Sequence, residues 1–198
     1  SVCAGLCHGL LVTKISLQPF VVTLCGLLIY RGLARWMTGD SSVGWEGKIP
    51  NLRKVATGGF EIPFTGFILP WPFVLMVIIA IMAAIFLHKT IYGRYLLALG
   101  RNEQAARYSG IDTTKMTILA YVLCSFIAGI GGTIIALDQG LIQPGPFGTF
   151  YELYAIAAAV LGRCSLRGGQ GFIFGVILGA ALLPLIRNSI SFLGIGDQ

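Results

Sequence analysis

Charged residues are scarce in this chain of 198 residues: 14 are Lys or Arg and 8 are Asp or Glu, which together make up 11% of the sequence. A soluble domain carries about 25% charged residues, because it must cover its surface with polar groups. Hydrophobic residues account for 56% of the chain, and they occur in long blocks. The composition therefore excludes an ordinary water-soluble globule and favours a lipid environment.

Motifs that carry enzymatic chemistry are also missing. The sequence contains no HExxH, no P-loop and no GxSxG elbow. The string Gly194-Ile195-Gly196-Asp197 matches the GxGD motif of intramembrane aspartyl proteases. Such an enzyme needs a second aspartate facing the first, and no acid lies deep in any apolar block. We therefore predict that the chain is not an enzyme and has no catalytic residues.

Neither a metal site nor a nucleic-acid surface is indicated. None of the five cysteines forms a CxxC pair. Cys3, Cys7 and His8 are close enough for one helix, but a metal site needs more ligands than these, so we predict none. The net charge of +6 arises from basic residues between apolar blocks, where membrane topology explains them without nucleic acid.

Long apolar blocks predict membrane-spanning helices, since about 20 residues of helix cross a bilayer core. Three blocks reach that length clearly, at residues 67–87, 116–137 and 172–193, and a weaker one covers 19–37. Residues 1–12 look like the tail of a span, and 152–161 form a shorter piece. We predict an all-α, polytopic transmembrane bundle with four or five spans in one domain over residues 1–198, truncated at both ends.

The distribution of charge between the spans predicts their orientation. Residues 89–115 hold five basic side chains against two acids, and Arg163 and Arg167 mark a second basic segment. Residues 138–152 contain two acids and no Lys or Arg. By the positive-inside rule, 89–115 and 163–170 face the cytoplasm, while 138–152, and with it 38–66, face outside.

Within the basic segment, residues 103–109 are predicted to form a short helix. Asn102 suits its N-cap, Glu103 suits its first turn and Gly110 suits the left-handed position after its end. Ala105 and Ala106 give this helix a small face that can approach another surface. A helix of two turns is not stable alone in water, so it is held by the rest of the chain or by a partner. A docking helix and a simple linker both fit this spacing.

The same segment resembles the coupling loop of permease subunits in bacterial ATP-binding cassette (ABC) importers of ribose and related monosaccharides. The matching residues, in order, are Gly100, Asn102, Glu103, Ala105, Ala106, Arg107, Ser109, Gly110 and Ile111. In that family the short helix sits in a cleft of the ATP-binding subunit. The resemblance implies that residues 89–115 form the coupling loop of this chain.

The resemblance extends over nearly the whole sequence. Near the start, GLLV at residues 9–12 and QPFVVTL at 18–24 are similar to the family's GLLV…PPFIVTLG. Near the end, Ser165-Leu166, Gly168-Gly169, Gly171, Gly175 and Gly179 follow its GGTSLxGGxGxxxGxxxGA pattern. Arg163 and Cys164 stand where the family usually has a second glycine and a threonine.

This resemblance implies a fragment of a permease of about ten spans in two inverted halves, located as a multi-pass protein in the bacterial inner membrane. It implies passage of a small sugar into the cytoplasm, with ATP and Mg bound by a cytoplasmic ATP-binding subunit and no cofactor bound by this chain. The other expected partners are a second permease subunit forming a homodimer, and an extracytoplasmic sugar-binding protein. An ABC permease for branched-chain amino acids or another small polar solute, and an ion-coupled carrier or channel, are the alternatives.

Two further groups of residues are candidates for function. Sugar hydroxyls need hydrogen-bond partners, and Gln18, Thr23, Gln139 and Gln143 are candidates to line the translocation path. Gly171, Gly175 and Gly179 recur every four residues, so we expect them on one face of a helix, where small residues allow close helix packing.

Overall fold

Helices account for most of the computed structural model, which describes residues 1–44, 50–61 and 68–192. The chain divides into two compact units, one of Ser1–Ile79 with Thr114–Phe147 and the other of Ala80–Thr113 with Gly148–Gln198. The all-α class predicted from the apolar blocks is confirmed, with a few very short strands added between the helices.

In the first unit, three helices pack through glycines: α1 (Val2–Lys14), α2 (Pro19–Thr38) and α7 (Thr113–Gln139). A Cβ at Gly5 of α1 would lie 2.6 Å from the Ser125 hydroxyl of α7, and one at Gly9 would lie 3.1 Å from the Cα of Ile118. The absence of side chains at these two positions is therefore what allows α1 to approach α7 closely.

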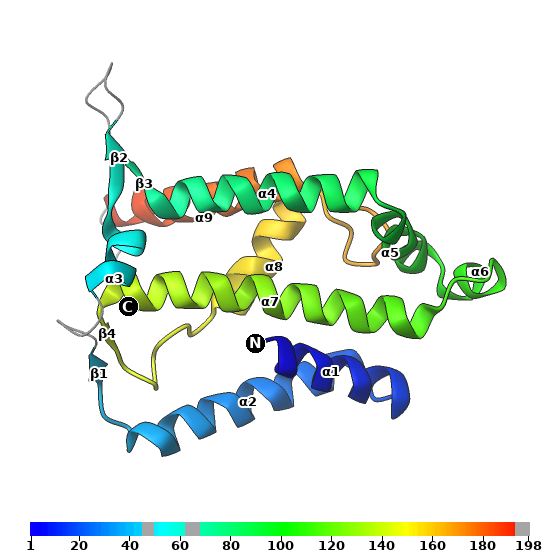
Figure 1. Ribbon diagram of the computed structural model, residues 1–198, viewed down its shortest axis with the longest axis horizontal. Helices are drawn as coiled ribbons and strands as arrows, with labels where there is room; N and C mark the ends of the chain where they lie inside the picture. Colours follow the sequence, from blue (N-terminus) through cyan, green and yellow to red (C-terminus); the bar gives the residue numbers. More distant parts are fainter. Residues whose placement is uncertain (45–49, 62–67, 193–198) are drawn as a thin grey trace. The chain divides into compact units, whose positions relative to one another are not determined.

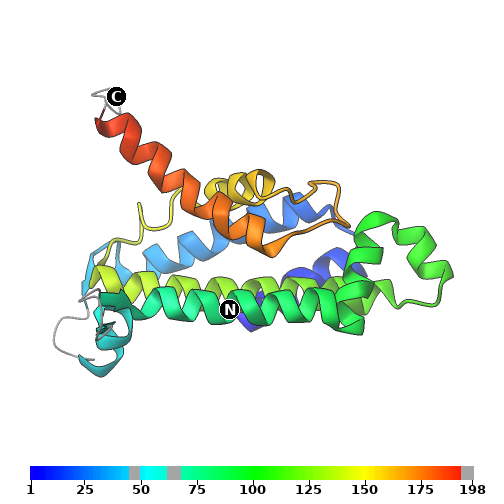
Figure 2. The same cartoon turned by 90° about the horizontal axis from the view of Figure 1, so that it is seen from above.

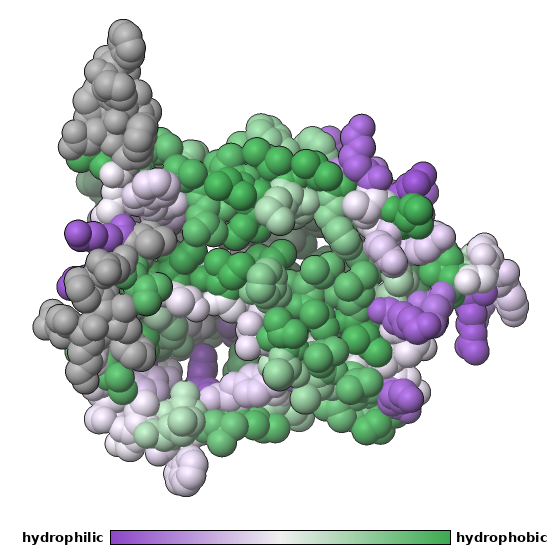
Figure 3. Space-filling model, viewed as in Figure 1, coloured by the Kyte–Doolittle hydropathy of each residue, from purple (hydrophilic) through white to green (hydrophobic). Residues whose placement is uncertain are grey.

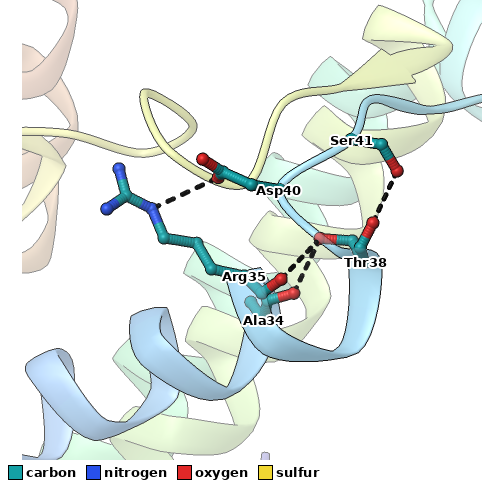
Figure 4. A network of polar contacts seen from close by, with 5 residues as sticks. All are labelled: Ala34, Arg35, Thr38, Asp40 and Ser41. Carbon is teal, nitrogen blue, oxygen red and sulfur yellow. Dashed lines mark hydrogen bonds and ion pairs between the residues drawn. The ribbon is translucent and has the colours of Figure 1, made fainter.

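Local signals in the sequence determine where α2 begins and ends, and Figure 4 shows the residues around its end. Pro19 occupies its first turn, where the missing N–H removes no helical hydrogen bond. Gly39 ends the helix at φ +59°, and the N–H of Asp40 donates to the Arg35 carbonyl at 3.0 Å. The Arg35 Nε lies 3.6 Å from the Asp40 carboxylate, so this arginine has an ionic partner beyond the end of the helix.

Short strands and one short helix occupy the segments between the helices of the first unit (Figure 1). Strand β1 (Val43–Gly44) pairs with β4 (Leu141–Ile142), and β2 (Gly59–Glu61) pairs with β3 (Ile68–Pro70), both antiparallel. Helix α3 (Pro50–Thr57) precedes β2. The first pairing joins two segments that the charge pattern places outside the membrane, so it agrees with the predicted orientation.

The second unit contains the later part of α4 (Trp71–Lys89), together with α5 (Ile91–Arg101), α6 (Glu103–Tyr108), α8 (Tyr151–Leu161) and α9 (Ile173–Phe192). Helices α8 and α9 pack closely against one another (Figure 2). With 11 residues, α8 is about 16 Å long and covers roughly half of a bilayer core. The prediction of a short helical piece at residues 152–161 is confirmed.

Three helices of the described chain, α2, α4 and α7, are long and apolar enough to cross a membrane. Shorter apolar helical segments are Val2–Lys14, Tyr151–Leu161 and Ile173–Ile186. The sequence predicted four or five spans, and the difference lies in α1 and in the last block, whose described apolar part is shorter than expected.

The distribution of hydrophobic and hydrophilic side chains over the surface supports the membrane assignment (Figure 3). No residue of α4 is buried, although this helix consists almost entirely of apolar residues. Figure 3 shows hydrophobic side chains covering the visible faces of α4 and α7, and hydrophilic ones around α5 and α6. An apolar helix with no buried side is stable in lipid or against further protein, not in water.

Candidate functional site

The candidate site is the segment between α4 and α7, which consists of the two helices α5 and α6. Sequence analysis did not predict α5. Its signal was Thr90, whose hydroxyl accepts a hydrogen bond from the Gly93 N–H at 3.1 Å and so caps the first turn. Gly93 is buried, and a Cβ there would lie 2.6 Å from the Leu87 Cα, so only glycine fits this close approach. The chain therefore turns sharply from α4 into α5 before it reaches α6.

Helix α6 begins as the sequence predicts. The Asn102 side-chain carbonyl accepts a hydrogen bond from the Ala105 N–H at 3.0 Å, and the Asn102 backbone carbonyl accepts one from Ala106 at 3.0 Å. Glu103 lies in the first turn, where the helix dipole favours negative charge. The assignment of Asn102 as the N-cap is confirmed.

The other end of α6 is closed by a Schellman motif. Gly110 has φ +82°, its N–H donates to the Arg107 carbonyl at 3.1 Å, and the Ile111 N–H donates to the Ala106 carbonyl at 3.1 Å. The Ser109 hydroxyl also donates to the Ala105 carbonyl at 2.9 Å. Most of the motif residues singled out from the sequence thus have a structural role: they define a six-residue helix at both ends.

The two alanines of α6 differ in exposure, which corrects one expectation. Ala106 is buried, at 4% exposure, so it does not belong to a face that approaches a partner. Ala105 is exposed, and Tyr108 is 90% exposed. Only Ala105 of the predicted small face is available for contact with another protein.

The residues that fix the end of α5 were not predicted from the sequence. The loop between α8 and α9 reaches Gly100 and Arg101, the last two residues of α5 (Figure 2). The Arg101 Nε donates to the Gly169 carbonyl at 3.4 Å. A Cβ at Gly168 would lie 2.9 Å from the Gly100 carbonyl oxygen. Both segments were predicted to face the cytoplasm, and their contact agrees with that orientation.

The candidates for the translocation path do not form one cluster. Gln18 is the N-cap residue of α2 and Thr23 lies in its second turn, where its hydroxyl donates to the backbone carbonyls of Pro19 and Phe20. Gln139 ends α7 and Gln143 follows β4, which pairs with β1 beyond the other end of α2. The four residues therefore lie in two pairs near opposite ends of a helix about 30 Å long.

The three glycines of the last block do not share one helix face. Gly175 and Gly179 lie in α9, where a Cβ would lie 3.0 Å from the Gly162 carbonyl carbon and 3.1 Å from that of Ala158, respectively. Gly171 lies two residues before α9 begins, and a Cβ there would make only ordinary contacts. The expected close packing holds for Gly175 and Gly179, and the expectation of a helical Gly171 is wrong.

A polar pair joins α1 to α2. The Tyr30 hydroxyl lies 3.3 Å from the His8 Nε2, and a Cβ at Gly26 would lie 2.7 Å from the His8 Cε1. His8 thus contacts Gly26 and Tyr30 of the neighbouring helix. Within the described chain, no group of three or more His, Cys, Asp or Glu side chains is close enough to hold a metal ion. Asp197, the aspartate of the GxGD string, lies outside the described residues.

Long apolar helices, with a short capped helix between two of them in the chain, define a helical membrane protein. The chain belongs to the family of permease components of branched-chain amino acid transport systems, whose model matches residues 1–196. The resemblance read from the motifs is therefore confirmed at the level of the family.

Individual relatives are permeases with several different printed solutes. The chain is 39% identical over 193 residues to the ribose import permease protein RbsC of Escherichia coli strain K12, covering 98% of this chain and 59% of the relative. It is 34% identical over 198 residues to the fructose import permease protein FruF of Bifidobacterium longum, covering 98% and 53%. It is 38% identical over 190 residues to the autoinducer 2 import system permease protein LsrC of Yersinia enterocolitica, covering 96% and 50%.

The chain therefore spans between half and three fifths of the length of these three relatives. No solved structure matches it.

Proposed function

We propose that this chain is part of the permease subunit of an ABC importer that moves a small sugar, ribose or a related monosaccharide, into the cytoplasm. The proposal is supported by the family assignment and by relatives named for the import of ribose and fructose. In this proposal the chain carries out no covalent chemistry. It provides the path, and the energy comes from ATP hydrolysed with Mg on a separate subunit.

The observation that carries the proposal is helix α6. Six residues do not form a stable helix alone, yet α6 is capped at both ends and rests on the buried Ala106. This construction presents Ala105, Arg107 and Tyr108 on a defined surface outside the apolar part of the chain. A rigid, exposed helix of this kind is suited to fit a groove on a cytoplasmic partner.

The remaining partners follow from the same proposal. A second permease subunit, as a homodimer, completes the path, and an extracytoplasmic sugar-binding protein delivers the solute to the outer face of the permease. The ATP-binding subunit clasps α6 and shifts the permease between its outward-facing and inward-facing states, because its open and closed forms bind α6 with different affinity. The complex lies in the bacterial inner membrane as a multi-pass assembly.

A second candidate solute class has its own support. The family model that matches this chain is described by branched-chain amino acid transport, and one relative is named for import of autoinducer 2. The polar groups in the described apolar helices include the Thr23 hydroxyl and the imidazole–phenol pair of His8 and Tyr30. Such hydrogen-bonding groups suit sugar hydroxyls better than the charged ends of an amino acid, so the sugar is preferred.

The experiment is a change at Ala105, which is exposed and lies on α6. In Ala105→Trp the added ring meets the partner's groove, so we expect recovery of the permease–ATPase complex and solute-stimulated ATP hydrolysis to be lost together. Leu141→Trp is the matched control: Leu141 is also exposed, but it lies in β4, on the side predicted to face outside. If Ala105→Trp assembles and responds to solute as the unmodified protein does, α6 is only a linker and an ion-coupled carrier or channel becomes the better proposal.

A further inference from the structure

The loop from Gly162 to Gly171, which we term the α8–α9 loop, is a compact, internally bonded segment. At its start the Cys164 N–H donates to the Ala159 carbonyl at 3.0 Å, which closes the end of α8. Within it the Ser165 N–H donates to the Gln170 carbonyl at 3.2 Å, and the Gly168 N–H donates to the Ser165 carbonyl at 2.9 Å. These bonds close the loop on itself, so that it is able to move as one piece.

This loop touches the end of α5 through backbone atoms. A Cβ added at Gly168 would lie 2.9 Å from the Gly100 oxygen and 3.1 Å from its Cα. A Cβ added at Gly169 would lie 2.7 Å from the Arg101 nitrogen. The Arg101 Nε–Gly169 O hydrogen bond crosses the same contact. At Gly168 no side chain separates the two backbones, and at Gly169 the Arg101 side chain also lies against the loop.

The other end of the loop is joined equally closely to α9. A Cβ at Gly162 would lie 2.5 Å from the Val176 nitrogen, and one at Gly175 would lie 3.2 Å from the Gly162 Cα. The end of α5, the α8–α9 loop and the α8–α9 helix pair are therefore connected by backbone contacts without a gap. Backbones that already touch cannot approach one another further, so a displacement of one is passed to the next.

We propose that the α8–α9 loop is a relay, through which movement of α6 displaces the α8–α9 helix pair. Asn102, the N-cap of α6, follows Arg101 directly in the chain, so a partner that moves α6 also moves the end of α5. Gly168 and Gly169 rest on that end, although Gly169 lies 68 residues after Arg101 in the sequence. The displacement therefore passes through them to α8 and α9. This inference rests on the proposed function, in which a cytoplasmic ATPase moves α6.

Arg101, Gly168 and Gly169 are positioning residues in this relay. They bind neither solute nor nucleotide, and they act by keeping two backbones in contact. A residue with a merely structural role affects assembly and transport together. A relay residue affects the amount of solute moved for each ATP hydrolysed, while the complex still assembles and still hydrolyses ATP.

The test uses the permease with its ATP-binding subunit and sugar-binding protein in proteoliposomes, with D-ribose as the solute. The main variant is Gly168→Ala, whose methyl group is forced against the Gly100 carbonyl. We expect complex recovery to be unchanged and the ratio of ribose moved to ATP hydrolysed to fall about tenfold, which is the size of a typical coupling between two sites. An unchanged ratio overturns the relay.

Gly148→Ala is the matched control. Gly148 has φ +68°, similar to the φ +88° of Gly168, but a Cβ there meets nothing within 4 Å, so this variant carries the backbone strain without the contact. We expect its ratio to stay at that of the unmodified protein. If it falls as much as in Gly168→Ala, strain alone is the cause and the relay is overturned.

Arg101→Met supplies a second test, which applies if Gly168→Ala does not fold. The methionine adds no bulk at the contact, so we expect this variant to keep the fold. It removes the hydrogen bond to Gly169, and we expect a smaller fall in the same ratio, with the complex intact; an unchanged ratio contradicts the relay. Failure of the proposed function is distinguishable, because the unmodified protein then shows no ATP-driven uptake at all.

Discussion

Removal of the Asn102 cap offers a quantitative test of how α6 works. In Asn102→Ala the Ala105 N–H loses its acceptor, which lies 3.0 Å away in the structure. Loss of an N-cap side chain costs about 1 kcal/mol of helix stability. Since α6 has only six residues, no other turn can absorb that loss.

The expected consequence is a weaker complex with the ATPase. A partner that binds only the folded helix has its affinity reduced by the fraction of molecules in which the helix is formed, so a loss of about 1 kcal/mol weakens binding by up to about fivefold. The assay is titration of the purified ATP-binding subunit against the permease in detergent or nanodiscs. Asn102→Ser keeps a capping oxygen and should retain the original affinity.

Two results would refute this reasoning. If Asn102→Ala binds the ATPase as tightly as the unmodified protein, then α6 is either not the docking element or not stabilised by its cap. If Asn102→Ser is as weak as Asn102→Ala, the asparagine itself contacts the partner and the capping argument is wrong.

Three further predictions concern packing and backbone conformation. Arg163 occupies the left-handed position after α8 at φ +65°. Arg163→Gly should therefore raise the free energy of thermal unfolding by about 1 kcal/mol. A fall would show that the arginine side chain makes a compensating contact. Gly26→Val should lower the free energy of unfolding by about 1–3 kcal/mol, because the valine displaces His8. Gly32→Val, with open space around it, should leave that free energy unchanged. Equal losses in detergent melting curves would contradict the α1–α2 packing. Gly110→Val forces a β-branched residue to φ +82° and should weaken ATPase binding at least as much as loss of the Asn102 cap; unchanged binding would exclude a role for the Schellman motif.

Much of the local structure could be predicted because its causes are local. The apolar blocks gave the positions of α2, α4, α7 and α9 to within a few residues, since burial in lipid requires an uninterrupted apolar helix. Asn102 and Gly110 predicted the two ends of α6, because capping depends on residue types at fixed offsets from a helix end. Thr90 offered the same kind of signal for α5 and was overlooked.

The contacts between distant segments could not be predicted in this way. The Arg101–Gly169 contact and the His8–Tyr30 pair do not follow from spacing in the sequence. Both contacts depend on how separate segments are brought together in the fold. The burial of Ala106 is a similar case: the sequence shows two equal alanines, and only the fold distinguishes the one that packs inward from the one that faces out. The glycine pattern of the last block likewise did not reveal that α9 begins after Gly171.

The central claim, that this chain belongs to a sugar permease driven by a separate ATPase, is tested most directly by uptake of labelled D-ribose into proteoliposomes. The permease is reconstituted with or without its ATP-binding subunit, with the sugar-binding protein supplied on the side opposite α6. We predict saturable uptake that requires both ATP and the ATP-binding subunit and is lost in Ala105→Trp. Uptake of equal rate without the ATP-binding subunit, or uptake that depends on an ion gradient, would contradict it.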